Sequence, residues 1–178
     1  FDDNYGKCKV AVNERDAEAV KLFDDNSAKF TADNNSLNWT TMGEVKGGRY
    51  EVEQLMKKTG WQVINTFESK GEMNINQYSI PPNHFPGDNH YRIKYVDSEN
   101  KEFYSVEIVY TSTESPVTFE PKEVTSIITL SKSLEYIVLD MNENEIRKGQ
   151  GKVIQLQDLK PGQYFLLVEN RKERFIKQ

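Results

Sequence analysis

The sequence predicts an all-β protein made of two consecutive β-sandwich modules. Short apolar or alternating runs recur along the 178 residues and are separated by turn residues, and such runs at spacings of roughly 8–12 residues are typical of antiparallel sandwiches. A polar Ser/Thr run from Thr111 to Pro116 interrupts them, as an extended connector between two modules would. A content of 37% hydrophobic and 29% charged residues suits small sandwiches that keep exposed faces.

The first 19 residues are assigned to a lead-in (residues 1–19). Residues 13–22 fit either a short helix, with Asn13 as its N-cap and acidic residues in the first turn, or the approach to the first strand. Cys8 excludes an internal disulfide because it is the single cysteine, and we interpret it as a free thiol.

Residues 20–110 are predicted to form the first sandwich. Its expected strands are residues 37–40, 49–53, 60–64, 90–96 and 103–110. The fourth of these alternates most strictly and places Tyr91, Ile93 and Tyr95 on one face. The fifth should pair back on the fourth as a hairpin across the polar turn at residues 97–100.

Residues 111–123 are predicted to be a linker, which Pro121 prolongs, and residues 124–178 the second sandwich. In the second module we expect a strand at residues 136–139, a polar turn after it, and a turn at residues 149–151 that holds two glycines.

The remainder of the second module is predicted to form two further strands and a basic finish. Residues 153–156 alternate with period two, and Pro161-Gly162 fits a β-turn, with Pro at one central position and Gly at the next. Residues 164–168 are a continuous apolar run, which suits a strand covered on both faces.

The order of particular residues in this last third is more specific than its strand pattern. The residues that carry the motif are Leu139, Asp140, Leu156, Leu159, Pro161, Gly162, Tyr164, Leu166, Val168 and Lys177. In this order they resemble the type A C-terminal sorting domain of the type IX secretion system of Bacteroidetes. That family shows an aspartate-leucine strand, a glycine-bearing turn, a leucine-rich segment that reaches a tyrosine, and a lysine-rich last strand.

A second resemblance covers about residues 20–109 of the first module. The segments 37–44, 50–53, 91–97 and 103–105 are similar to a fibronectin type III repeat, an immunoglobulin-like sandwich. Such repeats stand just ahead of type IX sorting domains in many exported proteins. The resemblance implies that Trp39 and Tyr91 are core anchors.

Together the resemblances imply a non-catalytic protein exported through the type IX system, in transit in the periplasm and then at the cell surface, in the outer membrane or secreted. The implied partners are translocon and sortase components, surface lipopolysaccharide if the module is cleaved, and a periplasmic sensor kinase if the chain is a PorA-type secretion signal protein. Two alternatives stay open: the tail of a larger surface protease or adhesin cargo, and a glycan-binding or adhesion module that acts through Trp61.

The sequence offers little for catalysis or cofactors, and we expect no enzyme, no cofactor and no metal site. His84, Asp88 and His90 lie in or beside a loop predicted at residues 81–88, where three prolines fix φ, and we interpret the histidines as solvated. Asp140, Asn142 and Asn144 begin like a calcium loop, but the glycine and glutamate that should follow are missing.

Two surface regions remain as partner edges. Phe103, Tyr104 and Tyr110 are an aromatic-rich edge for strand addition or, alternatively, a buried hairpin core. Arg171, Lys172 and Arg174 form a basic tip on the last hairpin, for recognition or for solubility. The formal net charge of −5, with cations dispersed among acids, gives nucleic-acid binding no electrostatic basis. No apolar run reaches the roughly 20 residues of a membrane helix.

Overall fold

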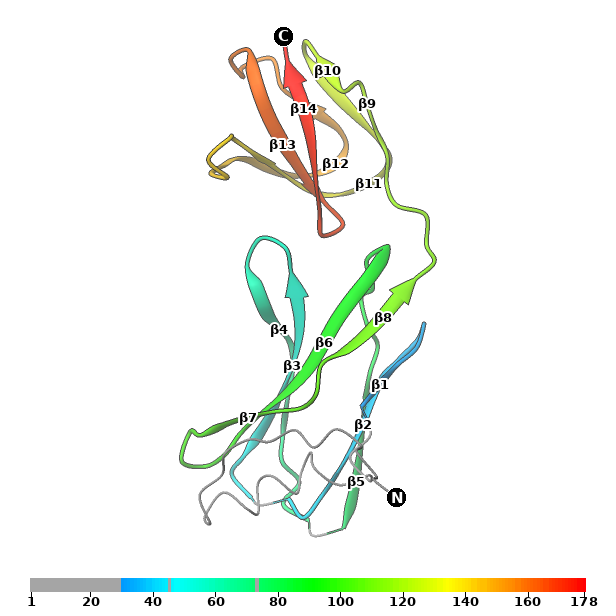
Figure 1. Cartoon of the computed structure of the whole chain (residues 1–178), viewed down its shortest axis with the longest axis vertical. Coiled ribbons are helices and arrows are strands. Elements are labelled where there is room, and N and C mark those ends of the chain that lie inside the picture. Colours follow the sequence, from blue (N-terminus) through cyan, green and yellow to red (C-terminus); the bar gives the residue numbers. More distant parts are fainter. Residues whose placement is uncertain (1–29, 45, 73) are drawn as a thin grey trace, which may run out of the picture. The chain divides into compact units, whose positions relative to one another are not determined.

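The computed structural model describes residues 30–44, 46–72 and 74–178, and within these ranges the chain forms strands, turns and loops but no helix (Figure 1). The predicted all-β class is confirmed. The chain forms two compact units, an N-terminal unit (Phe1–His84 and Asp88–Ser112) and a C-terminal unit (Phe85–Gly87 and Thr113–Gln178). The predicted helix or lead-in at residues 13–22 and Cys8 lie outside the described residues.

The N-terminal unit is built from two antiparallel sheets. The first has the order β1-β2-β5, with β1 (Thr31–Ala32), β2 (Leu37–Met42) and β5 (Ile75–Ile80). The second has the order β4-β3-β6-β7, with β4 (Gly60–Glu68), β3 (Arg49–Met56), β6 (Gly87–Val96) and β7 (Glu102–Tyr104), and β8 (Ile108–Ser112) also pairs with β6. Alternate residues of β2, β5 and β6 are buried, because side chains of a strand point to opposite faces in turn.

Aromatic rings fill the space between these two sheets. Trp39 on β2 stacks on Tyr78 of β5, with ring centroids 5.0 Å apart, and meets the edge of Phe67 at 5.3 Å. Tyr50 and Tyr91 are fully buried in the same cluster. The roles predicted for Trp39 and Tyr91 as core anchors are therefore confirmed.

The hairpin expected at residues 103–110 is divided in the structure. β7 pairs with the end of β6, where Tyr95 faces Phe103, and β8 is a separate strand that also pairs with β6. Residues 105–107 between them are not in a strand. Ser105 causes the break, because its Oγ accepts a hydrogen bond from the Ile93 N–H at 2.9 Å, which takes the place of a strand-to-strand bond.

The buried tyrosines make the N-terminal unit sensitive to alkali. Burial raises the pKa of Tyr50, Tyr78, Tyr91 and Tyr95 above the ordinary value of 10.0, that of Tyr91 to about 12. A phenol whose pKa is raised by folding stabilises the fold fully below its unfolded pKa, and this stability is lost as the pH rises through the folded value.

We therefore expect the free energy of unfolding of this unit to be constant toward pH 9 and to fall from about pH 10 to 12. Both tryptophans of the chain, Trp39 and Trp61, lie in this unit, so urea unfolding followed by tryptophan fluorescence reports on it selectively. Tyrosinate absorbance should rise together with the loss of the folded signal. A free energy that stays flat to pH 12 would contradict the assignment.

The C-terminal unit is one six-stranded sheet, and its buried apolar residues form one cluster. Its strands are β9 (Phe119–Glu120), β10 (Glu123–Val124), β11 (Ile127–Leu139), β12 (Glu145–Gln155), β13 (Gly162–Val168) and β14 (Arg171–Lys177), in the order β10-β14-β13-β11-β12. β10 runs parallel to β14, and the other pairs are antiparallel. β11 pairs with β9 through its first part and with β13 through its last part, with a register shift against β12 between Thr129 and Leu134.

Part of the predicted linker belongs to this second unit. Val117 and Phe119 are buried in its interior with exposures of 3% and 4%, and β9 pairs with β11. Within the predicted linker Thr113 to Pro116 and Glu120 to Glu123 are exposed in succession. The boundary at residue 124 was placed too late, because Pro121 was interpreted as part of a connector, whereas it stands between two short strands.

The turn predicted at residues 149–151 is instead part of β12, which runs without a break through both glycines. Gly149 faces Tyr136 across the strands, and the tyrosine ring lies over it. A Cβ at Gly149 would lie 2.5 Å from the Tyr136 hydroxyl oxygen. The glycine therefore provides room for a ring, not a change of chain direction.

Replacing Gly149 by alanine should lower the unfolding free energy of the C-terminal unit by about 1–3 kcal/mol, because Tyr136 must move out of its packed position. Gln150→Ala, at the exposed neighbouring position of the same strand, serves as the matched control. Hydrogen exchange of β11 and β12 measures both. Equal effects of the two substitutions would contradict the packing explanation.

Candidate functional site

The apolar residues of the predicted sorting motif lie inside the C-terminal unit. Leu156 and Leu166 are fully buried and Val168 is 2% exposed, all three in the interior cluster with Phe175. Leu139 is 1% exposed but is not a member of that cluster. These side chains are not available to a partner in the folded unit, so the motif describes how the unit is built.

The polar residues of the motif hold its turns. The Asp140 carboxylate accepts hydrogen bonds from the backbone N–H groups of Asn142 and Asn144 at 2.8 and 2.9 Å, and from the Asn144 side-chain amide at 2.9 Å. The side-chain bond, together with the two backbone bonds, lowers the pKa of Asp140. The turn that begins like a calcium loop is thus closed by its own hydrogen bonds.

The second turn of the motif joins β12 to β13. Leu159 packs partly buried against the interior, and Tyr164 stacks on Phe175 with centroids 5.7 Å apart. The Tyr164 hydroxyl donates to the carbonyl oxygen of Lys160 at 2.9 Å, which fastens the exposed segment that holds Pro161 and Gly162.

The predicted basic tip is used largely within the unit. Arg171 donates to the Val117 carbonyl at 2.6 Å, and the Glu169 carboxylate accepts from the Val117 N–H at 2.7 Å. Lys172 forms an ion pair with Glu143 at 2.5 Å. These three contacts fasten the β13–β14 hairpin to other parts of the unit.

The other two predicted cations differ in exposure. Lys177 is only 7% exposed, and its Nζ donates to the Gln178 carbonyl oxygen. Arg174 is exposed on β14 opposite Phe165 of β13. Of the basic residues near the end of the sequence, Arg174 is therefore the one best placed to meet a partner.

The aromatic edge predicted from Phe103, Tyr104 and Tyr110 does not form one surface. Phe103 and Tyr110 pack partly buried against the N-terminal core, on different strands. Tyr104 is 41% exposed on β7, the end strand of its sheet. Of the three residues, only Tyr104 lies on an accessible edge.

Tyr104 belongs to an aromatic and cationic ladder that sequence reasoning missed. The Arg92 guanidinium lies between two rings, 4.3 Å from the Trp61 centroid and 4.4 Å from that of Tyr104. Its Nε is 2.5 Å from a carboxylate oxygen of Glu53, which is largely buried. Arg92 therefore covers a face of the indole on which the glycan-binding alternative depended.

A buried carboxylate was also missed. Glu44 is 1% exposed and accepts hydrogen bonds from the Tyr78 hydroxyl at 2.7 Å, the Lys70 N–H at 2.7 Å and the Ser69 hydroxyl at 3.2 Å, in addition to one from the Thr41 hydroxyl. The donors come from β2, β5 and the segment between β4 and β5. Such a site fixes the fold locally and presents no free proton acceptor for chemistry.

The interpretation of both histidines as solvated is corrected by the structure. His84 stacks on Tyr110 at 4.0 Å, with Nδ1 2.9 Å from the Tyr91 hydroxyl and Nε2 2.8 Å from the Asp33 carbonyl oxygen. Because a carbonyl only accepts, Nε2 must donate, and Nδ1 of the neutral ring accepts from the tyrosine. His90 pairs with Glu107 at 2.5 Å. Among the described residues no group of three or more His, Cys, Asp or Glu could hold a metal ion.

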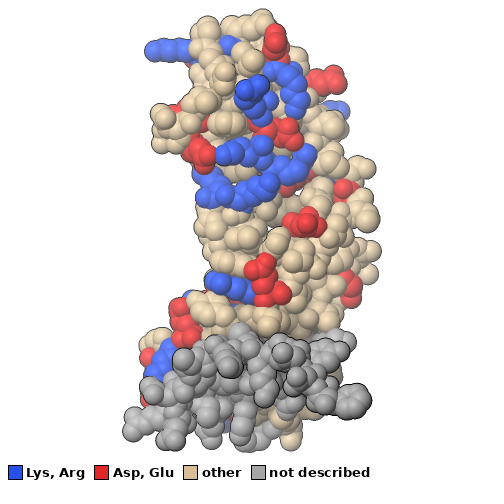
Figure 2. All heavy atoms as spheres, in the orientation of Figure 1, with Lys and Arg blue, Asp and Glu red and all other residues tan. Residues whose placement is uncertain are grey.

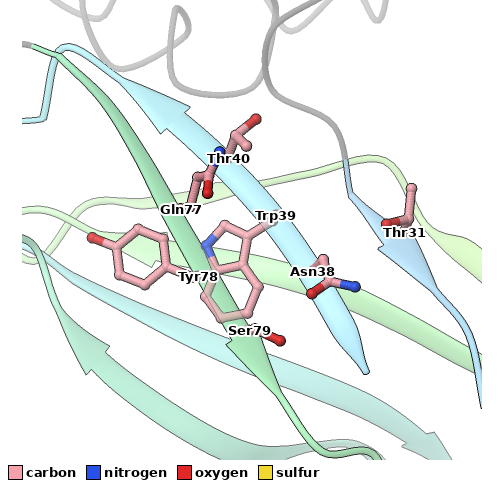
Figure 3. Close-up of a pocket in the computed structure, with 7 residues that line it drawn as sticks. All are labelled: Thr31, Asn38, Trp39, Thr40, Gln77, Tyr78 and Ser79. Carbon is pink, nitrogen blue, oxygen red and sulfur yellow. The ribbon is translucent and has the colours of Figure 1, made fainter. Parts of the chain in front are cut away.

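One hollow lies on the outer side of β2 and β5 (Figure 3). It has a volume of about 410 Å³ and is lined by Thr31, Asn38, Trp39, Thr40, Gln77, Tyr78 and Ser79. Trp39 and Tyr78 are turned to the core, with exposures of 2% and 8%, so neither ring offers a platform for a ligand. On its outer side the hollow therefore presents the amide and hydroxyl groups of Asn38, Thr40, Gln77 and Ser79. None of the described segments forms a helix that could cross a bilayer.

Comparisons with known proteins do not identify a family for the chain. No protein-family model matches the chain, and no curated protein matches it. The solved structures that match include the fibronectin domains FN1–FN3 of chicken CNTN1 (14% identity, 85% of this chain and 67% of that one, TM-score 0.31). They also include the central fibronectin-III array of RIM-binding protein (15%, 88% and 63%, TM-score 0.31) and domains 3 and 4 of rat CD4 (14%, 83% and 97%, TM-score 0.27).

Proposed function

We propose that the C-terminal unit is a folded sorting signal of the type IX secretion system, and that the chain is a non-catalytic exported protein. The observation that supports this is the use of the motif residues. Leu156, Leu166 and Val168 build the interior, while Asp140 and Tyr164 close the turns. A signal of this kind would be recognised as a folded shape, because the apolar residues of its motif are buried in the interior.

The proposal assigns the N-terminal unit the part of a fibronectin type III-like module ahead of the signal. Translocon and sortase components would be the partners that read the C-terminal unit. A periplasmic sensor kinase would be a further partner if the chain acts as a PorA-type reporter of secretion, and lipopolysaccharide would be the acceptor if the unit is cleaved. The protein would then pass through the periplasm to the cell surface.

Removal of the last strand tests the proposal in a bacterium that has the type IX system. β14 lies between β13 and β10, and Phe175 is 1% exposed in the interior, so deletion of residues 171–178 should open two strand edges and the core. We expect the deleted chain to accumulate in the periplasm, measured by fractionation and by surface labelling of intact cells. The matched control is Gln163→Ala, at an exposed position. Normal surface display of the deleted chain would refute the proposal.

A further inference from the structure

The sheet of the C-terminal unit carries apolar side chains on both faces. Leu166, Val168 and Val138 point into the interior cluster, so their neighbours along each strand point to the opposite face. On that outer face Ile137, Leu167 and Phe165 are half-buried and Leu139 is 1% exposed. Antiparallel sheets commonly bury one face and leave the other polar and solvated. The apolar outer face therefore requires a separate explanation.

Cross-strand register arranges this outer face in rows. One row runs from Lys148 on β12 through Ile137 on β11 and Leu167 on β13 to Lys172 on β14. The apolar pair Ile137 and Leu167 in the middle of this row is thus bordered by a lysine on either side.

The next row repeats the pattern at one border. Leu139 on β11 pairs with Phe165 on β13, which pairs with Arg174 on β14, while the β12 position that faces Leu139 is the exposed Glu145. An apolar stripe two strands wide therefore runs along β11 and β13 and is bordered by β12 and β14. In Figure 2 Lys and Arg atoms lie over the C-terminal unit, with Asp and Glu atoms among them.

The bordering cations differ in whether the unit itself neutralises them. Lys172 is paired with Glu143 at 2.5 Å and lies 5.0 Å from the Phe165 ring. Lys148 and Arg174 are exposed, and no carboxylate among the described residues forms an ion pair with either of them. These two charges on opposite borders are free to pair with acids of another molecule.

The dimensions suit one helix. Neighbouring strands are about 4.8 Å apart, so the borders on β12 and β14 are separated by roughly 14 Å. An α-helix with its side chains is about 10–12 Å across, and its apolar stripe can lie on the two central strands while its flanks reach both borders. The apolar side chains here are half-buried and do not protrude, which favours a protein surface over insertion into a bilayer.

We propose that this face, defined by Ile137, Phe165 and Leu167 with the cations Lys148 and Arg174, is a docking surface for an amphipathic helix of a partner protein. The apolar stripe of that helix would be bordered by Asp and Glu residues. The inference deepens the proposed function, on which it rests for the identity of the partner as a component that reads the sorting signal.

The test uses the whole chain and three synthetic helical peptides of about 18 residues, five turns, with one leucine stripe and flanks of Glu, Gln or Lys. Fluorescence anisotropy should give the order Glu, Gln, Lys from tightest to weakest. The double variant K148E/R174E should bind the Glu peptide about tenfold more weakly and should bind the Lys peptide more tightly than the unchanged chain does. K152E/K160E, which reverses two other exposed lysines, should bind all three peptides as the unchanged chain does.

Several results would overturn the inference. They are no binding of the Glu peptide, equal binding of all three peptides, or an equal loss in both double variants. Sedimentation with phosphatidylglycerol vesicles that is lost in K148E/R174E, without peptide binding, would show a lipid surface instead. Because the peptides are measured in solution, failure here leaves the export result unchanged, and failure of export leaves the peptide result unchanged.

Discussion

Leu166→Ala should destabilise the C-terminal unit by about 2–5 kcal/mol, because it removes a fully buried side chain and leaves a cavity in a small interior. For a unit of this size such a loss is a large part of the total stability. If the sorting signal is read as a fold, the variant should also accumulate in the periplasm. Hydrogen exchange of β13 and β14 measures the first effect, and surface labelling measures the second.

The control for Leu166 lies on the same strand. Gln163 is exposed, so Gln163→Ala should leave both stability and export unchanged. A Leu166→Ala chain that loses its hydrogen-exchange protection but is exported normally would show that the machinery reads sequence and not shape. That result would contradict the proposed function, but it would not contradict the assignment of Leu166 to the interior.

Glu44→Ala should have the second large effect, a loss of about 3–5 kcal/mol from the N-terminal unit. The substitution leaves the Tyr78 hydroxyl, the Lys70 N–H and two further hydroxyl donors without their acceptor in a buried place, and unsatisfied buried donors are costly. Urea unfolding followed by tryptophan fluorescence measures it.

Glu44→Gln separates hydrogen bonding from volume. Glutamine keeps one acceptor oxygen for two of the donors, so its loss of stability should lie between that of alanine and none. An alanine variant as stable as the unchanged chain would contradict the assigned network. Equal losses for both variants would show that the charge, and not the number of acceptors, carries the stability.

The sequence predicted the features that depend on neighbouring residues. The alternation of residues 90–96 placed Tyr91 and Tyr95 in the core, and Pro161-Gly162 marked a connection between strands, because strand period and turn chemistry are local properties. Trp39 was identified as a core anchor through a family resemblance that named its position.

Features that depend on strand pairing were missed. Glu53 and Arg92 are 39 residues apart in the sequence, and Glu44 and Tyr78 are 34 apart, so nothing in either segment indicates the partner. Gly149 was assigned to a turn because the ring that lies over it belongs to another strand. Val117 and Phe119 were assigned to a linker because Pro121 breaks the local pattern, although both residues are buried by the distant strands of the second unit.

The central claim is that the C-terminal unit directs export as a folded object. It is tested most directly by fusing a fluorescent reporter ahead of residue 1 of the 178-residue chain and measuring the reporter at the surface of intact cells that have the type IX system. The account predicts surface display for the unchanged chain and for Gln163→Ala, and retention in the periplasm for Leu166→Ala. Retention of the unchanged chain, or equal display of all three, would contradict it.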